Sequence, residues 1–255
     1  MKIVLYQQDI VWADHQANRQ KLIDLMGRTP GADLYVLPEM FTTGFATAPA
    51  GIAEESPSDT LALMQQLAAR YDAAIAGSIA LHEDGKYLNR FLFVKPDGSY
   101  AAYDKRHLFT YGGEHKTFTG GDRRVIVEWR GVRFLLLVCY DLRFPVWIRN
   151  RRDYDAILCV ASWPTVRRGA WDTLVRARAI ENQCFMAAVD RTGDDPACHY
   201  NGGTVFVDPY GEVQARCADG REEFVCADLD MDILHAFRAK FPVLSDADGF
   251  TLDVL

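Results

Sequence analysis

The chain has 255 residues, 49% of them hydrophobic, with 28 basic and 35 acidic side chains and a formal net charge of −7. This length and composition allow one large α/β domain with a sizeable core. Since no linker rich in Pro, Gly or Ser divides the chain, we expect a single domain over residues 1–255. An acidic chain without a long basic run is a poor candidate for binding nucleic acid or an anionic membrane.

The cysteines and the apolar runs indicate a cytoplasmic protein. Six cysteines occur without a C-x-x-C pair, a pattern that favours reduced thiols over a disulfide framework. No apolar run reaches the roughly 18 residues of a membrane helix. Because the first residues lead straight into a predicted strand, we expect neither a signal peptide nor membrane contact.

Apolar residues recur at strand and helix periods along the chain. Strands are predicted over residues 2–7, 34–37, 74–81, 87–94, 99–103, 124–129, 133–138, 156–162, 185–189, 203–207, 212–215 and 223–229. Helices are predicted over residues 18–27, 59–70, 170–182 and 231–240, the third with Trp171, Leu174, Val175 and Ile180 on its inner face. This order favours a mixed sheet with helices on its faces. Residues from about 241 are expected to form a tail that packs on a partner subunit.

The second predicted strand ends in the sequence PEMF, which places Glu39 beside a proline and large apolar side chains. A carboxyl group in such surroundings is expected to have a raised pKa, which suits proton transfer near neutral pH. An exposed loop glutamate is the alternative for an isolated Pro-Glu pair.

A cluster of charged residues follows the strand that ends at residue 103. Residues 104–109 (DKRHLF) contain Lys105, and the Gly-rich loop after them carries Glu114. Such a cluster is usually a solvated surface. Aromatic side chains surround it at positions 103, 109, 111 and 118, which would be unusual for a purely solvated loop. We therefore interpret the cluster as the wall of a pocket.

Residues 134–138 are all apolar and predict a strand buried on both faces, with Cys139 at its carboxyl end. Pro145 stops the strand and suits the first turn of a helix that begins at Val146. Cys139 is therefore expected at the end of a central strand, on a turn into a helix. There the helix amino terminus favours negative charge and would lower the pKa of a thiol. A buried cysteine that acts as a small apolar filler is the alternative.

Glu39, Lys105 and Cys139 thus each follow a predicted strand. In open α/β sheets, functional sites form at the carboxyl ends of the strands. Acyl transfer needs a nucleophile, a proton carrier and a positive group for the oxyanion. A thiol, a carboxylate and an ammonium group supply these three roles.

Three sequence blocks carry a resemblance to a known family. PEMF at 38–41, DKRHLF at 104–109 and CYDLRFP at 139–145 resemble, in order and separation, the signature blocks of the nitrilase (carbon–nitrogen hydrolase) superfamily. Residues 177–182 (ARAIEN) and 203–212 resemble two further blocks, so the likeness covers almost the whole chain. Within the superfamily, YDKRHLF and VCYDLRFPVW resemble the bacterial omega-amidases.

The resemblance implies a four-layer α-β-β-α sandwich, usually dimerised through its helical face and carboxyl-terminal segment, so we expect a homodimer. It implies that Glu39 is the general base, Lys105 the oxyanion lysine and Cys139 the nucleophile. Glu114 falls where many members place a second, supporting glutamate. The resemblance implies no metal and no organic cofactor.

The likeness to omega-amidases implies a substrate class. It is a small omega-monoamide of a dicarboxylic keto acid, such as 2-oxoglutaramate, which would lose ammonia through a cysteinyl thioester. The backbone N–H of Tyr140 would join Lys105 at the oxyanion. The substrate carboxylate needs an arginine or backbone donors, and Arg143, Arg167 and Arg168 are the candidates.

Each substrate-binding candidate also has a structural alternative. Arg143 could pair with Asp141, and the other two arginines could be solvated. Three aromatic residues are expected to wall the pocket, although each could equally belong to the core; they are Tyr111, Trp163 and Phe118.

Three other functions stay open at this point. His107 or His115 could be the base of a cysteine–histidine hydrolase. Cys139, Cys159 and His107 could serve a thiol redox or metal-binding protein, although their spacing fits no zinc pattern. The Glu-Lys-Cys chemistry could also act on an N-carbamoyl amine or a nitrile, because pocket volume and charge decide that choice.

Overall fold

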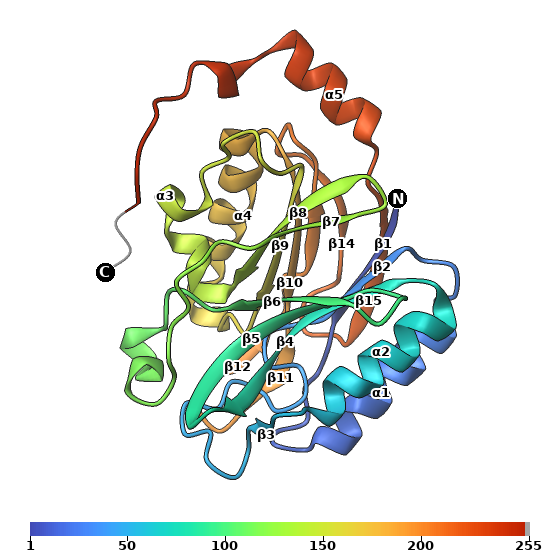
Figure 1. Ribbon diagram of the computed structural model, residues 1–255, viewed down its shortest axis with the longest axis vertical. Coiled ribbons are helices and arrows are strands. Elements are labelled where there is room, and N and C mark those ends of the chain that lie inside the picture. Colours follow the sequence, from blue (N-terminus) through green and yellow to red (C-terminus); the bar gives the residue numbers. More distant parts are fainter. Residues whose placement is uncertain (253–255) are drawn as a thin grey trace.

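Two β-sheets lie face to face in the computed structural model, which describes residues 1–252 (Figure 1). In the first sheet, the strand order is β15 (Glu223–Asp228), β1 (Lys2–Gln7), β2 (Leu34–Val36), β4 (Ala74–Glu83), β5 (Lys86–Val94) and β6 (Tyr100–Asp104), with β3 (Glu54–Glu55) paired to β4. In the second sheet, it is β14 (Val213–Arg216), β13 (Val205–Val207), β10 (Phe185–Asp190), β9 (Ala156–Ala161), β8 (Val132–Val138) and β7 (Ile126–Trp129). A separate hairpin consists of β11 (Thr192–Asp194) and β12 (His199–Asn201).

Helices cover the outer face of each sheet. Helices α1 (His15–Arg28) and α2 (Asp59–Tyr71) bury their apolar sides on the first sheet, and α4 (Arg168–Asn182) packs on the second (Figure 1). Side-chain oxygens cap the first two helices: Asp14 accepts from the N–H of Ala17, and Ser58 from that of Leu61. The result is the predicted four-layer α-β-β-α sandwich.

The main core fills the space between the two sheets. Apolar side chains from both inner faces interdigitate there; for example, the rings of Phe93 on β5 and Phe134 on β8 lie 6.0 Å apart between centroids. Fully burying one such side chain contributes roughly 1.5–3 kcal/mol to folding. This packed interior fixes the relative positions of the strand ends, and the catalytic candidates lie at these ends.

Strand direction brings those ends to one edge. Strand β2 runs parallel to β4, and β6 has the same direction because two antiparallel pairings separate it from β4. In the second sheet, β8 and β9 are parallel. Strand β8 was expected to be a central strand, but it lies second from the edge, next to β7.

The last part of the described chain packs back on the sandwich: Leu234 is fully buried in the main core, and Arg238 pairs with Asp155 at 2.9 Å. Helix α5 (Met231–Lys240) and the following residues arch over the second sheet (Figure 1). The short helix α3 (Pro145–Ile148) begins with a proline at its first position, as predicted. No helix within residues 1–252 combines the length and apolar character needed to cross a lipid bilayer.

Most predicted elements match the structure within two or three residues. The short strands β3, β11 and β12 were not predicted, because two or three residues are too few to show a period. The predicted inner face of α4 was wrong at Ile180, which is 50% exposed. Arg178 is buried on that helix instead, and its guanidinium donates to the carbonyl of Leu142 at 2.9 and 3.0 Å.

Candidate active site

A lysine and two glutamates form a fully buried cluster where the strands of the first sheet end. Lys105 follows β6, and its ammonium donates to Oε1 of Glu39 at 2.8 Å and to Oε2 of Glu114 at 2.9 Å. Glu39 lies three residues past β2, and Glu114 begins the short 3-10 helix η2 (Glu114–Lys116). Segments that are distant in sequence therefore meet at one ammonium group.

Asn89 on β5 binds both carboxylates of the cluster. Its Nδ2 donates to Oε1 of Glu39 at 2.8 Å and to Oε1 of Glu114 at 3.1 Å. The backbone N–H of Phe109 also donates to Oε2 of Glu114 at 2.6 Å. Each carboxylate is thus oriented by several donors, which hold it in one geometry.

Burial sets the electrostatics of this cluster. Desolvation raises the pKa of Glu39, and the negative charge of Glu114 adds to this effect, whereas the ammonium of Lys105 opposes it. The prediction of a raised pKa for this carboxyl group is confirmed. Burial alone would lower the pKa of Lys105, but the two carboxylates outweigh it and the net shift is upward. The lysine is therefore held as a cation.

Cys139 begins the 3-10 helix η3 (Cys139–Arg143), directly after β8. Its backbone is in the left-handed region, with φ at +46°, a conformation that costs a non-glycine residue about 1–2 kcal/mol. Its Sγ lies 3.9 Å from the carbonyl oxygen of Ser162. The sharp turn lifts the thiol out of the strand, so that it is partly exposed in a cavity.

The pKa of the Cys139 thiol differs from the sequence prediction. Burial and the neighbouring carboxylate of Glu39 raise this pKa well above its ordinary value, and the charge of Lys105 only partly offsets them. The prediction of a lowered pKa was wrong, because a short 3-10 helix provides a weaker field than desolvation and a nearby anion. The thiol therefore rests in its protonated form and needs a base in order to react.

Ser162 links the two sheets at this site. It follows β9, and its backbone N–H donates to Oε2 of Glu39 at 2.9 Å. Its hydroxyl donates to the backbone carbonyl of Glu39 at 3.3 Å. The carboxylate from the first sheet is thus fixed against the second sheet, which carries Cys139.

Asp141 anchors the cysteine turn to the lysine loop. Its carboxylate accepts from the N–H of Val138 at 3.0 Å, from the hydroxyl of Tyr103 at 2.8 Å, and from the N–H and Nδ1 of His107 at 3.0 and 2.8 Å. His107 also stacks flat on Phe144, with 3.7 Å between ring centroids. Both contacts fix this histidine as a structural element.

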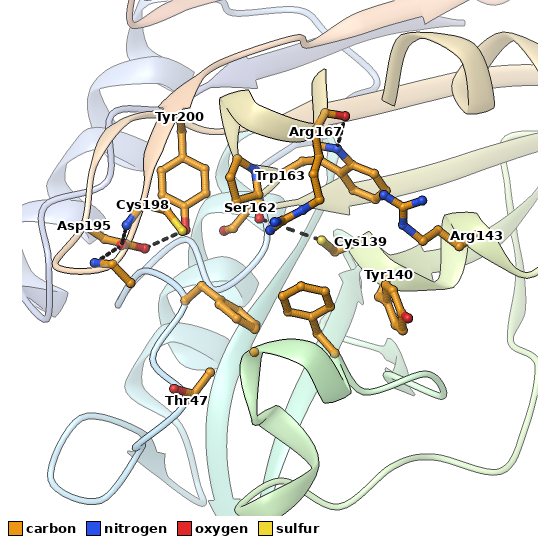
Figure 2. Close-up of a pocket in the computed structure, with 15 residues that line it drawn as sticks. Thr47, Cys139, Tyr140, Arg143, Ser162, Trp163, Arg167, Asp195, Cys198 and Tyr200 are labelled. Carbon is orange, nitrogen blue, oxygen red and sulfur yellow. Dashed lines mark hydrogen bonds between the residues drawn. The ribbon is translucent and has the colours of Figure 1, made fainter. Parts of the chain in front are cut away.

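Figure 2 shows the cavity into which Cys139 points. It holds about 130 Å³ and is mostly apolar at its walls. Its lining residues come from the segments that follow strands of both sheets and from the β11–β12 hairpin; they are Phe45, Thr47, Phe109, Gly112, Cys139, Tyr140, Arg143, Ser162, Trp163, Pro164, Arg167, Asp195, Ala197, Cys198 and Tyr200. A small cavity with few polar groups suits a small substrate.

Comparison with known proteins identifies the family. The carbon-nitrogen hydrolase family model matches residues 2–239. The chain belongs to the carbon–nitrogen hydrolase family. It is 46% identical to omega-amidase YafV of Yersinia enterocolitica, over 99% of this chain and 98% of that one, and 35% identical to 2-oxoglutaramate amidase of Bacillus subtilis, over 84% and 85%. It superimposes with a TM-score of 0.96 on a 42% identical family member from Xanthomonas campestris, solved with an arsenic adduct in the active site, over 99% of both chains.

Of the three aromatic residues predicted to wall the pocket, Trp163 lines the cavity of this carbon–nitrogen hydrolase and the other two do not. Tyr140, Trp163 and Arg143 line it. Tyr111 does not: it is 87% exposed and contacts the ring of Phe109 from outside, because the Gly-rich loop turns it to the surface. Phe118 is buried in a small core cluster away from the cavity.

The three candidate arginines of the hydrolase have different surroundings. Arg168 pairs with Asp172 and Asp219, both at 2.9 Å, and points away from the cavity. Neither Arg143 nor Arg167 has an ion-pair partner among residues 1–252. The alternative of a pair between Arg143 and Asp141 is therefore wrong, because His107 and Tyr103 occupy that carboxylate.

Four contributors to the site of this hydrolase were not predicted. Asn89 is fully buried in β5, but the charged Arg90 beside it makes this a weak signal that a polar group is needed inside. Ser162 acts through its backbone N–H, which leaves no signal in the sequence. Phe45 and the β11–β12 hairpin lie in segments without a clear period.

The two alternatives based on histidine or metal fit the hydrolase site poorly. His107 is bound to Asp141, and His115 lies exposed in η2. Within the described residues, Cys139, Cys159 and His107 do not lie close enough together to hold a metal ion. Glu39 is the carboxylate whose charge acts on the thiol of Cys139 and raises its pKa.

Proposed function

We propose that this protein is an omega-amidase that releases ammonia from a small omega-monoamide of a 2-oxo dicarboxylic acid, such as 2-oxoglutaramate. The observation that carries the proposal is the thiol of Cys139 in a small cavity, at the strand ends where two carboxylates hold a buried lysine. The names of the relatives, omega-amidase and 2-oxoglutaramate amidase, support the substrate class.

Acylation begins with a proton transfer. Glu39 takes the thiol proton as Sγ of Cys139 attacks the amide carbon, because the raised pKa of the thiol leaves little thiolate at rest. A C–S bond forms and the carbonyl π-bond breaks, which places negative charge on oxygen. The ammonium of Lys105 and the backbone N–H of Tyr140 stabilise that oxyanion. Glu39 then returns the proton to the nitrogen, the C–N bond breaks and ammonia leaves.

Deacylation reuses the same groups. A water molecule gives its proton to Glu39 and adds to the thioester carbon, again with Lys105 at the oxyanion. Collapse of this intermediate breaks the C–S bond, and Glu39 returns the proton to the sulfur. Glu114 has a supporting role: it holds Lys105 and, by its charge, raises the pKa of Glu39. Buried charges that are paired in this way need no reorganisation during the reaction.

Arg143 is the proposed anchor for the substrate carboxylate. It lies four residues after Cys139 on the same 3-10 turn, and its guanidinium stacks on Trp163 at 4.7 Å from the ring centroid. A guanidinium held flat on an aromatic ring keeps its N–H edge available for a carboxylate.

An ammonia-release assay tests the proposed function. The substrates are 2-oxoglutaramate, an N-carbamoyl amine and an aliphatic nitrile at matched concentrations, with Cys139→Ala as the control enzyme. We expect release from 2-oxoglutaramate by the wild type, little from the other two and none by the variant. Rapid turnover of the ureido compound or the nitrile, without turnover of the amide, would contradict the proposal.

We also propose that the protein is a cytoplasmic homodimer in which residues from about 241 lie at the interface. The face formed by α4, α5 and the β13–β14 turn exposes several large apolar side chains; they are Ile180, Tyr210, Ile233 and Phe241. The ring of Tyr210 lies 4.0 Å from that of Phe237, which connects the turn to α5. A second copy of the chain would cover such a patch. Six free thiols, including the exposed Cys226, suit a reducing compartment.

Sedimentation velocity tests the proposed dimer. Phe241→Asp puts a charge into the apolar patch, whereas Arg123→Asp changes an exposed position on another loop. We expect the wild type and Arg123→Asp to sediment as dimers and Phe241→Asp to dissociate. A monomeric wild type at micromolar concentration would refute the assembly.

A further inference from the structure

The cavity has two cationic side chains, and the proposed carboxylate anchor uses one of them. Two of its lining residues are arginines, and neither has an ion-pair partner among residues 1–252. Asp195 is the acidic residue of the lining, and its carboxylate is hydrogen-bonded within the β11–β12 hairpin and forms no ion pair with Arg143 or Arg167. It accepts from the N–H groups of Ala197 and Cys198, both at 2.7 Å, and from the hydroxyl of Tyr200 at 2.6 Å.

Arg167 and Arg143 are held by the same wall. The guanidinium of Arg143 lies over the ring of Trp163, and the indole N–H of Trp163 donates to the backbone carbonyl of Arg167 at 2.9 Å. The guanidinium of Arg167 lies 5.1 Å from the ring centroid of Phe109. In the view of Figure 2, the two arginine side chains flank Cys139. An occupant of this small cavity is therefore exposed to both cations.

We infer that Arg167 is a specificity-determining residue that makes the enzyme prefer 2-oxo acid amides to 2-amino acid amides. This inference rests on the proposed function. A 2-oxo acid has a net charge of −1, and its keto oxygen accepts a hydrogen bond from a guanidinium. The corresponding 2-amino acid amide has an ammonium group at the same carbon. That group can only donate, and the cation beside it repels it.

The neighbouring Arg168 provides a matched control. It has the same charge and is one residue away, but its side chain is directed to Asp172 and Asp219, outside the cavity. Arg168→Gln removes a positive charge near the site without changing the lining. Arg167→Lys keeps the charge but loses the planar fork of donors.

The test measures kcat/KM for ammonia release from 2-oxoglutaramate, glutaramate and glutamine. In Arg167→Gln, we expect the value for 2-oxoglutaramate to fall roughly 10- to 150-fold, mostly through KM, as when a hydrogen bond to a charged group is lost. The ratio of 2-oxoglutaramate to glutamine should fall at least about tenfold, with glutaramate less affected. Arg167→Lys should recover part of this ratio, and Arg168→Gln should match the wild type.

An equal fall for all three substrates in Arg167→Gln would overturn the inference, because it would indicate a structural or catalytic role. An unchanged ratio would overturn it as well. A failure of the proposed function looks different: the wild type itself would then release no ammonia from 2-oxoglutaramate while hydrolysing another amide.

Discussion

The buried cluster and the outer wall of the cavity both contain charged groups, but the groups differ in burial and in ion pairing. Lys105, Glu39 and Glu114 are fully buried and paired with one another. Arg143 and Arg167 are partly exposed, have no acidic partner among residues 1–252, and rest on aromatic rings. The ion pairs of the first group are formed without substrate, whereas the arginines of the second group can form an ion pair with a negatively charged substrate.

This difference separates chemistry from selection. A cluster whose hydrogen bonds are already formed stabilises a developing oxyanion without reorganisation. Unpaired arginines instead gain their partner on binding, so they affect which molecule enters. Substitutions in the cluster should therefore lower turnover of all amides. Substitutions in the wall should instead change the ratio of kcat/KM between one amide and another.

The largest effect is expected from the nucleophile. Cys139→Ala removes the atom that forms the thioester, and loss of a nucleophile typically costs roughly 10⁶-fold in kcat. Ammonia release from 2-oxoglutaramate should fall to background, while thermal unfolding stays close to that of the wild type, since the lost sulfur faces a cavity. Retained turnover in this variant would place the chemistry at another residue.

Lys105→Met should lower both activity and stability. Loss of an oxyanion donor typically costs 10²- to 10³-fold in kcat. The change also leaves two buried carboxylates without their cation, which typically destabilises a protein by about 3–5 kcal/mol. Denaturant unfolding measures the second effect. Adding Glu114→Gln to Lys105→Met should restore part of the stability, and an unchanged midpoint in the single variant would argue against a charged lysine in the core.

The pH profile of the free enzyme is the next prediction. Glu39 must be ionised to accept the thiol proton, and burial raises its pKa above 4.5. As the pH falls through this raised pKa, the carboxylate is protonated and kcat/KM should decrease. Profiles of kcat/KM between pH 4 and 9 give the acid limb. A limb at or below pH 4.5 would show that Glu39 is not the base or is not desolvated.

Two variants should shift this acid limb in opposite directions. Asn89→Leu removes a donor that lowers the pKa of Glu39, so the limb should move to higher pH. Glu114→Gln removes a negative charge that raises this pKa, so the limb should move to lower pH. Both should lower kcat/KM by roughly tenfold or more, through the lost hydrogen bonds. Shifts in the same direction would mean that the variants act by general disruption.

Much of the site was visible in the sequence because its residues follow strands with a clear period. Glu39, Lys105 and Cys139 each follow such a strand within one to three residues, and parallel strand ends meet at one edge. The thiol pKa was not predictable from local sequence, because it depends on a carboxylate 100 positions away. The exposed side chain of Tyr111 and the β11–β12 hairpin depend on loop geometry, which follows glycine and tertiary packing more than periodicity.

The most direct test of the central claim compares two bases. Glu39→Gln keeps the shape of the carboxyl group but cannot take a proton, whereas His107→Gln removes the ring that pairs with Asp141. We predict that ammonia release from 2-oxoglutaramate falls to background in Glu39→Gln and stays within about tenfold of the wild type in His107→Gln. Near-normal turnover in Glu39→Gln, with loss of turnover in a folded His107→Gln, would contradict the account.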